Sequence, residues 1–394
     1  MFNSDMYALG AAPSSIRELF AYGLARKAEI GADKVFDFSL GNPSVPAPPQ
    51  VADALREAIE LPPEQLHSYS MAQGAFEARD AIAENLNERF DAGVSADDLY
   101  LTAGAAGALT CTLRALIAGE SPEVIVVPPY FPEYRMWIQS MGATCVEVPA
   151  RTSDFQLDVP AIEAAITANT RAIIINTPNN PVGVVYSPEI LAELNQALQR
   201  KRKELGTPVY VISDEPYREL LYTGKPITWV PSIIDTAIVC YSWSKSLSLP
   251  GERIGYVLVP PTVPDARDIY LAVCGAGRAL GYVCAPVLFQ RVAQKCCGVP
   301  ADVDAYVRNR KLLTGIMDDL GYTYIEPQGA FYLWIKALEP DAQAFSEKAK
   351  AHELLLVASD SFGVKGWVRA GYCVDEDTIR NSRDAFAALK KDYE

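Results

Sequence analysis

A lysine, an aspartate and a tyrosine stand directly after two predicted strands of this 394-residue chain. Asp214 follows the apolar run 209–212 with Tyr217 three residues later, and Lys245 follows the run 237–241 within SWSKSLSLPGER. Such a lysine is ordinarily a solvated surface charge, but a lysine removed from water is a neutral amine that can form an imine. A carboxylate can keep a ring nitrogen protonated, and a phenol can donate a hydrogen bond to a ring oxygen. These three residues together are what pyridoxal phosphate requires of a protein.

The other needs of such a cofactor are a ring-stacking group and a cradle for its phosphate. Phe131 follows the apolar run 124–127, and Asn180 lies in NTPNNPVG after the run 172–175. A phosphate is bound by hydroxyl groups, by a cation and by the backbone of a small-residue turn at the start of a helix. The candidates in this chain are Ser242 and Ser244, Arg253, and Gly104-Ala105-Ala106. Taken singly, each has an ordinary structural explanation, such as a cap, a turn, a core aromatic or a surface ion pair. Their joint placement at the ends of strands has no such obvious structural explanation.

The elements that must position these side chains alternate between strand and helix. Continuous apolar runs of four to six residues are typical of strands buried on both faces, and they occur at 124–127, 145–148, 172–175, 209–212, 237–241 and 254–259. Helical patterns fall at 133–141 and 188–205, and the run 101–119 resembles a buried helix. This alternation predicts an α/β fold with a mostly parallel sheet flanked by helices, and ligands bind at the carboxyl ends of such strands.

A different pattern begins near residue 300 and predicts a smaller α+β lobe. A long helix comes first, and the segments 322–325 and 330–335 flank EPQG as a hairpin. A strand at 366–374 and a terminal helix at 378–393 follow. The N-terminal helix, about 16–30, fits neither pattern, and we expect it to pack on this lobe.

Composition excludes several functions. With 35 Lys and Arg against 49 Asp and Glu, the net charge of −14 argues against nucleic-acid and anionic-membrane partners. Only two histidines occur, and the eight cysteines show no C-x-x-C spacing, so we expect no metal site. The N-terminus lacks a basic segment followed by an apolar core, and the apolar setting of the cysteines fits a reducing compartment, which predicts a cytoplasmic protein.

The chain resembles the aspartate aminotransferase superfamily of fold type I pyridoxal-phosphate enzymes. The resemblance runs in order through SLGNP, SYSMAQG, TAGAAGAL, PPYFPEY, NTPNNPVG, SDEPY, SWSKSLSLPGERIGY, QGAFY and VRAGY. It covers nearly the whole chain, and the succession N-P-x-G, D-x-x-Y and S-x-S-K followed by Arg253 is highly specific. It implies a large cofactor-binding domain over 46–290, a small C-terminal domain over 291–394, and an N-terminal arm and small-domain segment over 1–45.

The resemblance also implies roles for individual residues. Lys245 would form the Schiff base and act as general base and acid, while Asp214 would pair with the ring nitrogen and Glu215 would point to the other face of its strand. The cofactor would be pyridoxal 5'-phosphate, held by residues of the motifs above: Tyr217 and Asn180 at the ring oxygen, Phe131 on the ring face, and Gly104, Ala105, Ala106, Ser242, Ser244 and Arg253 at the phosphate. Tyr69 would reach the phosphate of a second subunit, which implies a homodimer with shared active sites. Arg369, with Asn180 and the backbone of Gly41, would bind the substrate carboxylate.

The implied reaction moves an amino group between an L-amino acid and a 2-oxo acid. The donor stays open, because the turn Gly104-Ala105-Ala106-Gly107 lacks the lysine that many resembling enzymes use to meet a distal carboxylate. Arg278 is the nearest spare cation, and it could read such a group across a dimer interface or form an ordinary ion pair. A C–S β-lyase on the same scaffold is an alternative. A sensor with a DNA-binding domain is disfavoured by the acidic charge and by the early start of the motifs.

Overall fold

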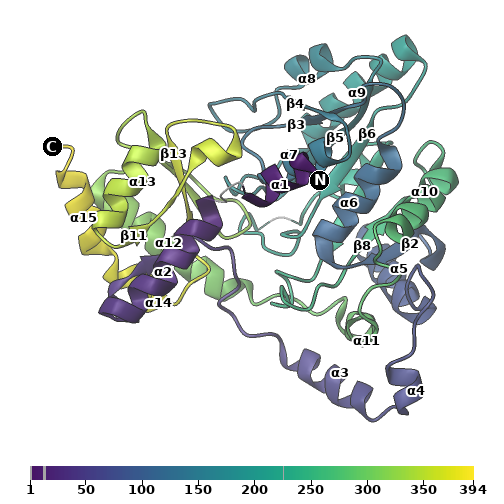
Figure 1. The fold of residues 1–394 in the computed structure, drawn as a ribbon, viewed down its shortest axis with the longest axis horizontal. Coiled ribbons are helices and arrows are strands. Elements are labelled where there is room, and N and C mark those ends of the chain that lie inside the picture. Colours follow the sequence, from purple (N-terminus) through teal and green to yellow (C-terminus); the bar gives the residue numbers. More distant parts are fainter. Residues whose placement is uncertain (1, 12–14, 225) are drawn as a thin grey trace.

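A seven-stranded sheet forms the centre of the larger part of the molecule (Figure 1). The computed structural model describes residues 2–11, 15–224 and 226–394. In spatial order the sheet contains β2 (Leu99–Thr102), β8 (Gly255–Leu258), β7 (Ala237–Ser242), β6 (Tyr210–Asp214), β5 (Thr170–Asn176), β3 (Glu123–Val126) and β4 (Thr144–Glu147). Only β8 runs antiparallel to its neighbours. The predicted mostly parallel sheet with flanking helices is confirmed.

The side chains of alternate residues in the central strands pack on opposite faces of this sheet. Ile173 and Ile175 of β5 belong to a core with α8 (Val159–Ala165) and α9 (Pro188–Leu205), whereas Ala172 and Ile174 belong to another with α6, α7 and α10. The latter helices span Gly104–Leu116, Glu133–Ser140 and Ala266–Ala279. A third core joins β2, β7 and β8 to α3 (Pro49–Ile59), α5 (Phe76–Phe90) and α11 (Val287–Cys296), with α4 (Pro63–Leu66) nearby. Burial on both faces explains why these strands read as continuous apolar runs.

A four-stranded antiparallel sheet lies in the smaller part of the molecule, at the left of Figure 1. Its order is β12 (Val357–Ala358), β13 (Trp367–Gly371), β10 (Tyr332–Lys336) and β9 (Tyr324–Ile325), with β9 and β10 paired as the predicted hairpin. Around it lie α12 (Val303–Leu320), α13 (Ala342–Ala351), α14 (Glu376–Asn381), α15 (Arg383–Lys391) and the short parallel pair β1 (Phe36–Asp37) and β11 (Leu354–Leu355).

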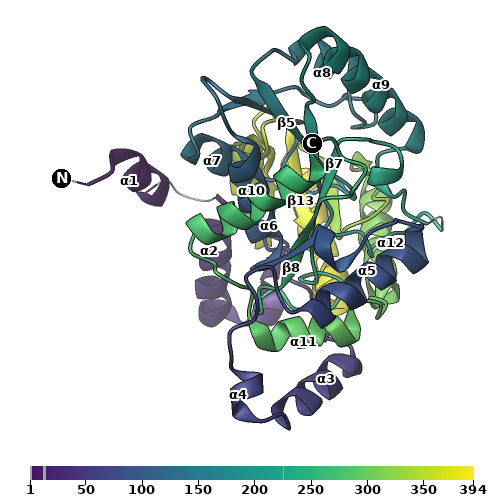
Figure 2. The same ribbon diagram turned by 90° about the vertical axis from the view of Figure 1, so that its right-hand side faces the viewer.

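The N-terminal helix α2 (Ser15–Ile30) packs on this smaller part, as predicted. Its Arg26 bonds Glu353 at 2.6 Å, and its Lys27 bonds Asp37 at 2.9 Å. The preceding helix α1 (Ser4–Ala11) protrudes at the side of the molecule in Figure 2, and it contacts α7.

Two predicted helices are wrong in part. The run 101–119 is not one helix, because β2 ends at Thr102 and α6 begins at Gly104, whose φ of 73° marks the break. The terminal helix is divided into α14 and α15 at Ser382, a buried residue whose hydroxyl donates to the carbonyl of Ile379. Within the described part of the chain, no helix is long and apolar enough to cross a membrane.

Candidate active site

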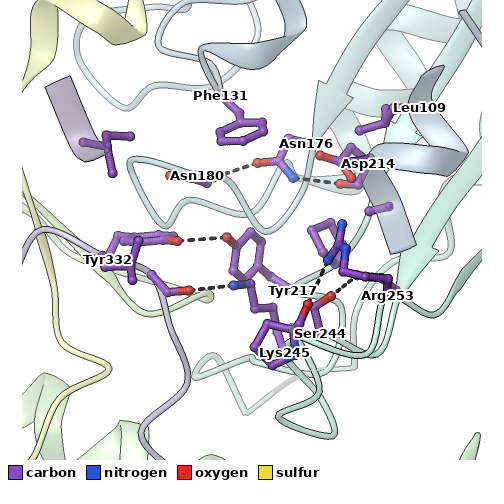
Figure 3. A pocket seen from close by; sticks show the side chains of 18 of the residues that line it. Leu109, Phe131, Asn176, Asn180, Asp214, Tyr217, Ser244, Lys245, Arg253 and Tyr332 are labelled. Carbon is purple, nitrogen blue, oxygen red and sulfur yellow. Dashed lines mark hydrogen bonds between the residues drawn. The ribbon is translucent and has the colours of Figure 1, made fainter. Parts of the chain in front are cut away.

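A cavity of about 270 Å³ lies beyond the carboxyl ends of β5, β6 and β7 (Figure 3). Parallel pairing brings these ends together, with Asn176 of β5 opposite Asp214 of β6. The cavity gathers residues from both sheets and from α2, α6 and α7. Its lining includes Ile16, Leu40, Gly41, Ala105, Ala106, Leu109, Phe131, Trp137, Asn176, Asn180, Asp214, Tyr217, Ser242, Ser244, Lys245, Arg253, Tyr332 and Arg369.

Lys245 presents its amine to this cavity from the turn after β7. Its Nζ donates a hydrogen bond of 2.6 Å to the carbonyl oxygen of Gly41, and lies 5.4 Å from the ring centre of Phe331. The protein packed around this half-buried side chain lowers the pKa of Lys245 to about 8, and the positive charges of Arg369 and Arg253 act in the same direction. A substantial fraction of the amine is therefore neutral and nucleophilic at mildly alkaline pH.

Asp214 ends β6 as a buried carboxyl group with one oxygen engaged and one free. Its Oδ2 accepts a short hydrogen bond from the hydroxyl of Tyr134, whereas its Oδ1 has no partner in the described structure. Burial raises the pKa of Asp214 to about 7, against the lowering effect of the Tyr134 hydrogen bond. A buried oxygen without a partner costs free energy unless a bound group supplies a donor.

Glu215 points to the opposite face of the strand, as expected. It bonds Arg218 at 2.6 Å, and both side chains are 2% exposed. Its charge is thus matched by a protein group, whereas that of Asp214 is not.

Arg369 of β13 approaches the cavity from the smaller sheet. Its Nη1 donates to Oδ1 of Asn180 at 3.0 Å and its Nη2 to the carbonyl oxygen of Ser39 at 2.6 Å, whereas Nε has no partner in the described structure. Asn180 is fixed in turn by its backbone N–H, which donates to Asn176 at 2.6 Å. Asn176 donates to the backbone carbonyl of Asp214 at 2.8 Å. A held guanidinium with unused donor capacity suits a carboxylate ligand.

Two tyrosines complete the side of the cavity nearest the smaller sheet. The hydroxyl groups of Tyr217 and Tyr332 are 2.9 Å apart, and the guanidinium carbon of Arg369 lies 4.4 Å from the ring centre of Tyr332. A Cβ atom at Gly41 would lie only 1.9 Å from the Tyr332 hydroxyl, so no other residue fits there without movement. The backbone carbonyl of Gly41 can therefore approach Lys245 closely.

The start of α6 and the turn after β7 form a small basic hollow. Ala105 and Ala106 line it in the first turn of α6, and Gly104 could not carry a Cβ without approaching the Arg253 Nη2 to 3.0 Å. The Ser242 and Ser244 hydroxyl groups are 3.1 Å apart. Helix N-terminal N–H groups, hydroxyl groups and a guanidinium form a typical anion site.

Three of the predicted site residues lie outside the cavity lining, and one of them, Gly104, is buried beside Arg253 at the start of α6. Tyr69 is 88% exposed, and Arg278 is exposed in the last turn of α10. Neither contacts the cavity of its own chain, so their assigned roles stay predictions about a second subunit.

Sequence reasoning assigned no role to several residues that the fold brings to the site. Tyr134 bonds Asp214, Tyr332 bonds Tyr217, and Ile16 and Trp137 line the cavity. Tyr134 and Tyr332 stand inside the motifs PPYFPEY and QGAFY, so those motifs were a usable signal. Nothing in the local sequence marks Ile16 or Trp137.

Comparisons with known proteins agree with this arrangement. The family model for aminotransferase class I and II matches residues 33–386. A crystal structure of an aminotransferase from Eubacterium rectale is 51% identical, with a TM-score of 0.97, covering 100% of this chain and 99% of that one. A putative aminotransferase from Bacillus subtilis is 30% identical, over 96% of this chain and 95% of its own. The aspartate aminotransferase of Thermotoga maritima is 29% identical, over 89% of this chain and 90% of its own.

The fold and the site define a pyridoxal-phosphate-dependent transaminase. The chain belongs to the class I and II aminotransferase family. Its substrates are accordingly an amino acid and a keto acid.

Proposed function

We propose that this cavity transfers the amino group of an L-amino acid to a 2-oxo acid, with Lys245 as the residue that binds pyridoxal phosphate covalently. The observation that carries the proposal is the combination of the Lys245 amine, with its pKa lowered to about 8, and the unpartnered Oδ1 of Asp214 in one cavity. A neutral amine can attack a carbonyl carbon, and a free carboxylate oxygen can accept a hydrogen bond from a protonated ring nitrogen.

The residues present fit the cofactor. Asp214 would hold the ring nitrogen, the hydroxyl of Tyr217 and the amide of Asn180 would bond the ring oxygen, and Phe131 would cover one ring face. The phosphate would lie in the hollow at the start of α6, held by Gly104, Ala105, Ala106, Ser242, Ser244 and Arg253. When bound, pyridoxal phosphate withdraws electrons from the substrate Cα, which makes the Cα proton removable.

The substrate α-carboxylate would bind to Arg369, with Asn180 and the backbone at Gly41 beside it. With its amine free, Lys245 would take the proton from the substrate Cα as general base and later return it as general acid. The hydrogen bond from Lys245 to the Gly41 carbonyl, 2.6 Å long, supports this role because it keeps the amine close to the carboxylate site.

The assembly and the domain division are part of the same proposal. We propose a homodimer in which Tyr69 of each subunit completes the phosphate site of the other, since this exposed tyrosine cannot serve its own cavity. The large domain would span 46–290, and the small domain 291–394 together with the arm and segment over 1–45.

A donor panel tests the proposed reaction against the β-lyase alternative. The cofactor-loaded protein is incubated with single amino acids, including cysteine-type substrates, with and without 2-oxoglutarate, and both keto acids and ammonia are measured. Transamination predicts keto acid formation that depends on the acceptor and releases no ammonia. Pyruvate and ammonia formed without an acceptor would instead establish the lyase.

A further inference from the structure

The cavity has an apolar wall whose side chains the proposed chemistry does not use. Ile16, Leu40 and Trp137 line it together with Phe131. Ile16 enters from α2 and packs against a core cluster that contains Phe362, whose ring centre is 5.2 Å from the guanidinium carbon of Arg369. This apolar wall and Arg369, the residue proposed to bind the substrate carboxylate, thus line one cavity.

Trp137 extends this wall along α7. Its ring is 6.1 Å from that of Phe131 in an edge-to-face arrangement, and both side chains are half-buried. Ile16 from α2 and Trp137 from α7, beside the ring-stacking residue Phe131, thus both face the cavity that must hold the substrate side chain. Apolar and aromatic side chains with unused surface favour an apolar ligand group.

The positive charges of the cavity are all committed by the proposed function, on which this inference rests. Its lining contains three cationic side chains, Lys245, Arg253 and Arg369. Lys245 is the reacting amine, Arg253 faces the phosphate hollow, and Arg369 takes the α-carboxylate. A second carboxylate on the substrate would enter an apolar region where the described residues of this chain supply no further cation, and burying an unpaired charge is costly.

We propose that the enzyme selects amino acids with a bulky neutral side chain, aromatic above all, which Ile16 and Trp137 contact. Arg278 does not offset this preference within one chain, because it is exposed and lies outside the cavity lining. Ile16 and Trp137 are thus specificity-determining residues, distinct from the residues that bind the cofactor.

Binding of unreactive acids to the cofactor-loaded wild-type protein tests this selection without turnover. Calorimetry at one pH compares 3-phenylpropanoate, which carries a ring, with succinate, which carries a second carboxylate. We expect 3-phenylpropanoate to bind at least about tenfold more tightly, the scale expected for burying an aromatic ring. Trp137→Ala should reduce this ratio about fivefold or more, whereas Trp137→Phe, which keeps an aromatic ring, should retain most of it.

Four results would overturn the proposal. The first is tighter binding of succinate, and its loss in Arg278→Ala would then identify Arg278 of a second subunit as the missing cation. The second is an equal weakening of both acids by Trp137→Ala, which would reduce Trp137 to a structural residue. The third is binding of neither acid by a protein that carries its cofactor, which would refute the proposed carboxylate site and hence the proposed function itself. The fourth is a higher kcat/KM for aspartate than for phenylalanine in an enzyme whose activity still depends on Arg369, which would refute the selectivity alone.

Discussion

Replacing Tyr134 by phenylalanine tests how the protein prepares Asp214 for its cofactor. The Tyr134 hydroxyl donates to Oδ2 of Asp214, and both residues are buried, at 1% and 5% exposure. The substitution removes one oxygen atom and leaves the ring in its core, so packing changes little. Asp214 is then a buried carboxyl group without any side-chain donor on either oxygen.

The size of the effect follows from that hydrogen bond. A hydrogen bond to a charged group contributes about 1.5–3 kcal/mol, so cofactor affinity at pH 7 should fall by roughly tenfold to a hundredfold. Burial raises the pKa of Asp214 to about 7 and Tyr134 lowers it, so the variant raises this pKa further. A larger fraction of the Asp214 carboxyl group is then protonated at neutral pH and carries no negative charge to stabilise the protonated ring nitrogen. The defect should therefore shrink as the pH rises from 7 to 9.

Equilibrium titration of the cofactor-free protein with pyridoxal phosphate measures this affinity through visible absorbance. Tyr130→Phe is a matched control, because the Tyr130 hydroxyl donates to Glu147 at 2.5 Å and lies outside the cavity lining. It should bind the cofactor as the wild type does. If Tyr134→Phe stays within twofold of the wild type at pH 7, the reasoning about Asp214 is refuted.

Four further predictions concern the same site. Covalent capture of the cofactor by Lys245, followed by stopped-flow absorbance, should speed up with pH and level off above about 8, because only the neutral amine reacts; a pH-independent rate would contradict this. Cofactor-free Asp214→Asn should melt at a higher temperature than the wild type at pH 8 but not near pH 4, because a carboxyl group whose pKa is raised by folding destabilises the fold once it must ionise; equal melting curves at pH 8 would count against it. Arg369→Ala should lower kcat/KM for neutral and dicarboxylic donors alike by roughly thirtyfold to several thousandfold, the kinetic equivalent of about 2–5 kcal/mol; a normal rate would rule out the carboxylate role. Inactive Tyr69→Ala and Lys245→Ala subunits should regain activity when mixed, since a heterodimer contains one intact site; full activity of a monomer would exclude shared sites.

The central sheet was predictable because its strands carry their own signal. Burial on both faces forces an uninterrupted apolar run, and β5, β6 and β7 each show one. Helix α9 was predictable to its ends, since Ser187 caps its first turn and Gly206, with φ of 77°, terminates it. Parallel pairing then places the residues after these strands at one edge, so Asp214 and Lys245 could be nominated together.

Other parts of the fold depend on contacts that a local pattern does not contain. Strand β2 has only four residues, and its apolar residues are followed directly by those of α6. The boundary between the strand and the helix therefore depends on the conformation of Gly104. At Ser382, where the terminal helix is divided, the hydroxyl bonds the carbonyl of Ile379, and Ile379 and Phe386 on either side are buried in the core of the smaller part. Ile16 lines the cavity from the start of α2, a helix that the Arg26–Glu353 and Lys27–Asp37 pairs hold to the smaller part.

Two unpartnered atoms at the cavity match groups of the proposed ligands. Oδ1 of Asp214 lacks a donor, and Nε of Arg369 lacks an acceptor, although both atoms are buried. Glu215 and Arg218, on the other face of the strand, are each 2% exposed and pair with each other, although Nη2 of Arg218 has no partner in the described structure. The same fold can thus pair its buried charges, and it does not do so at the cavity. A ring N–H at Asp214, a carboxylate at Arg369 and a phosphate at the start of α6 would satisfy all three places at once. An amino acid bound to pyridoxal phosphate supplies these three groups. In our proposal, the apolar wall that contains Ile16 and Trp137 then discriminates among amino acids by their side chains.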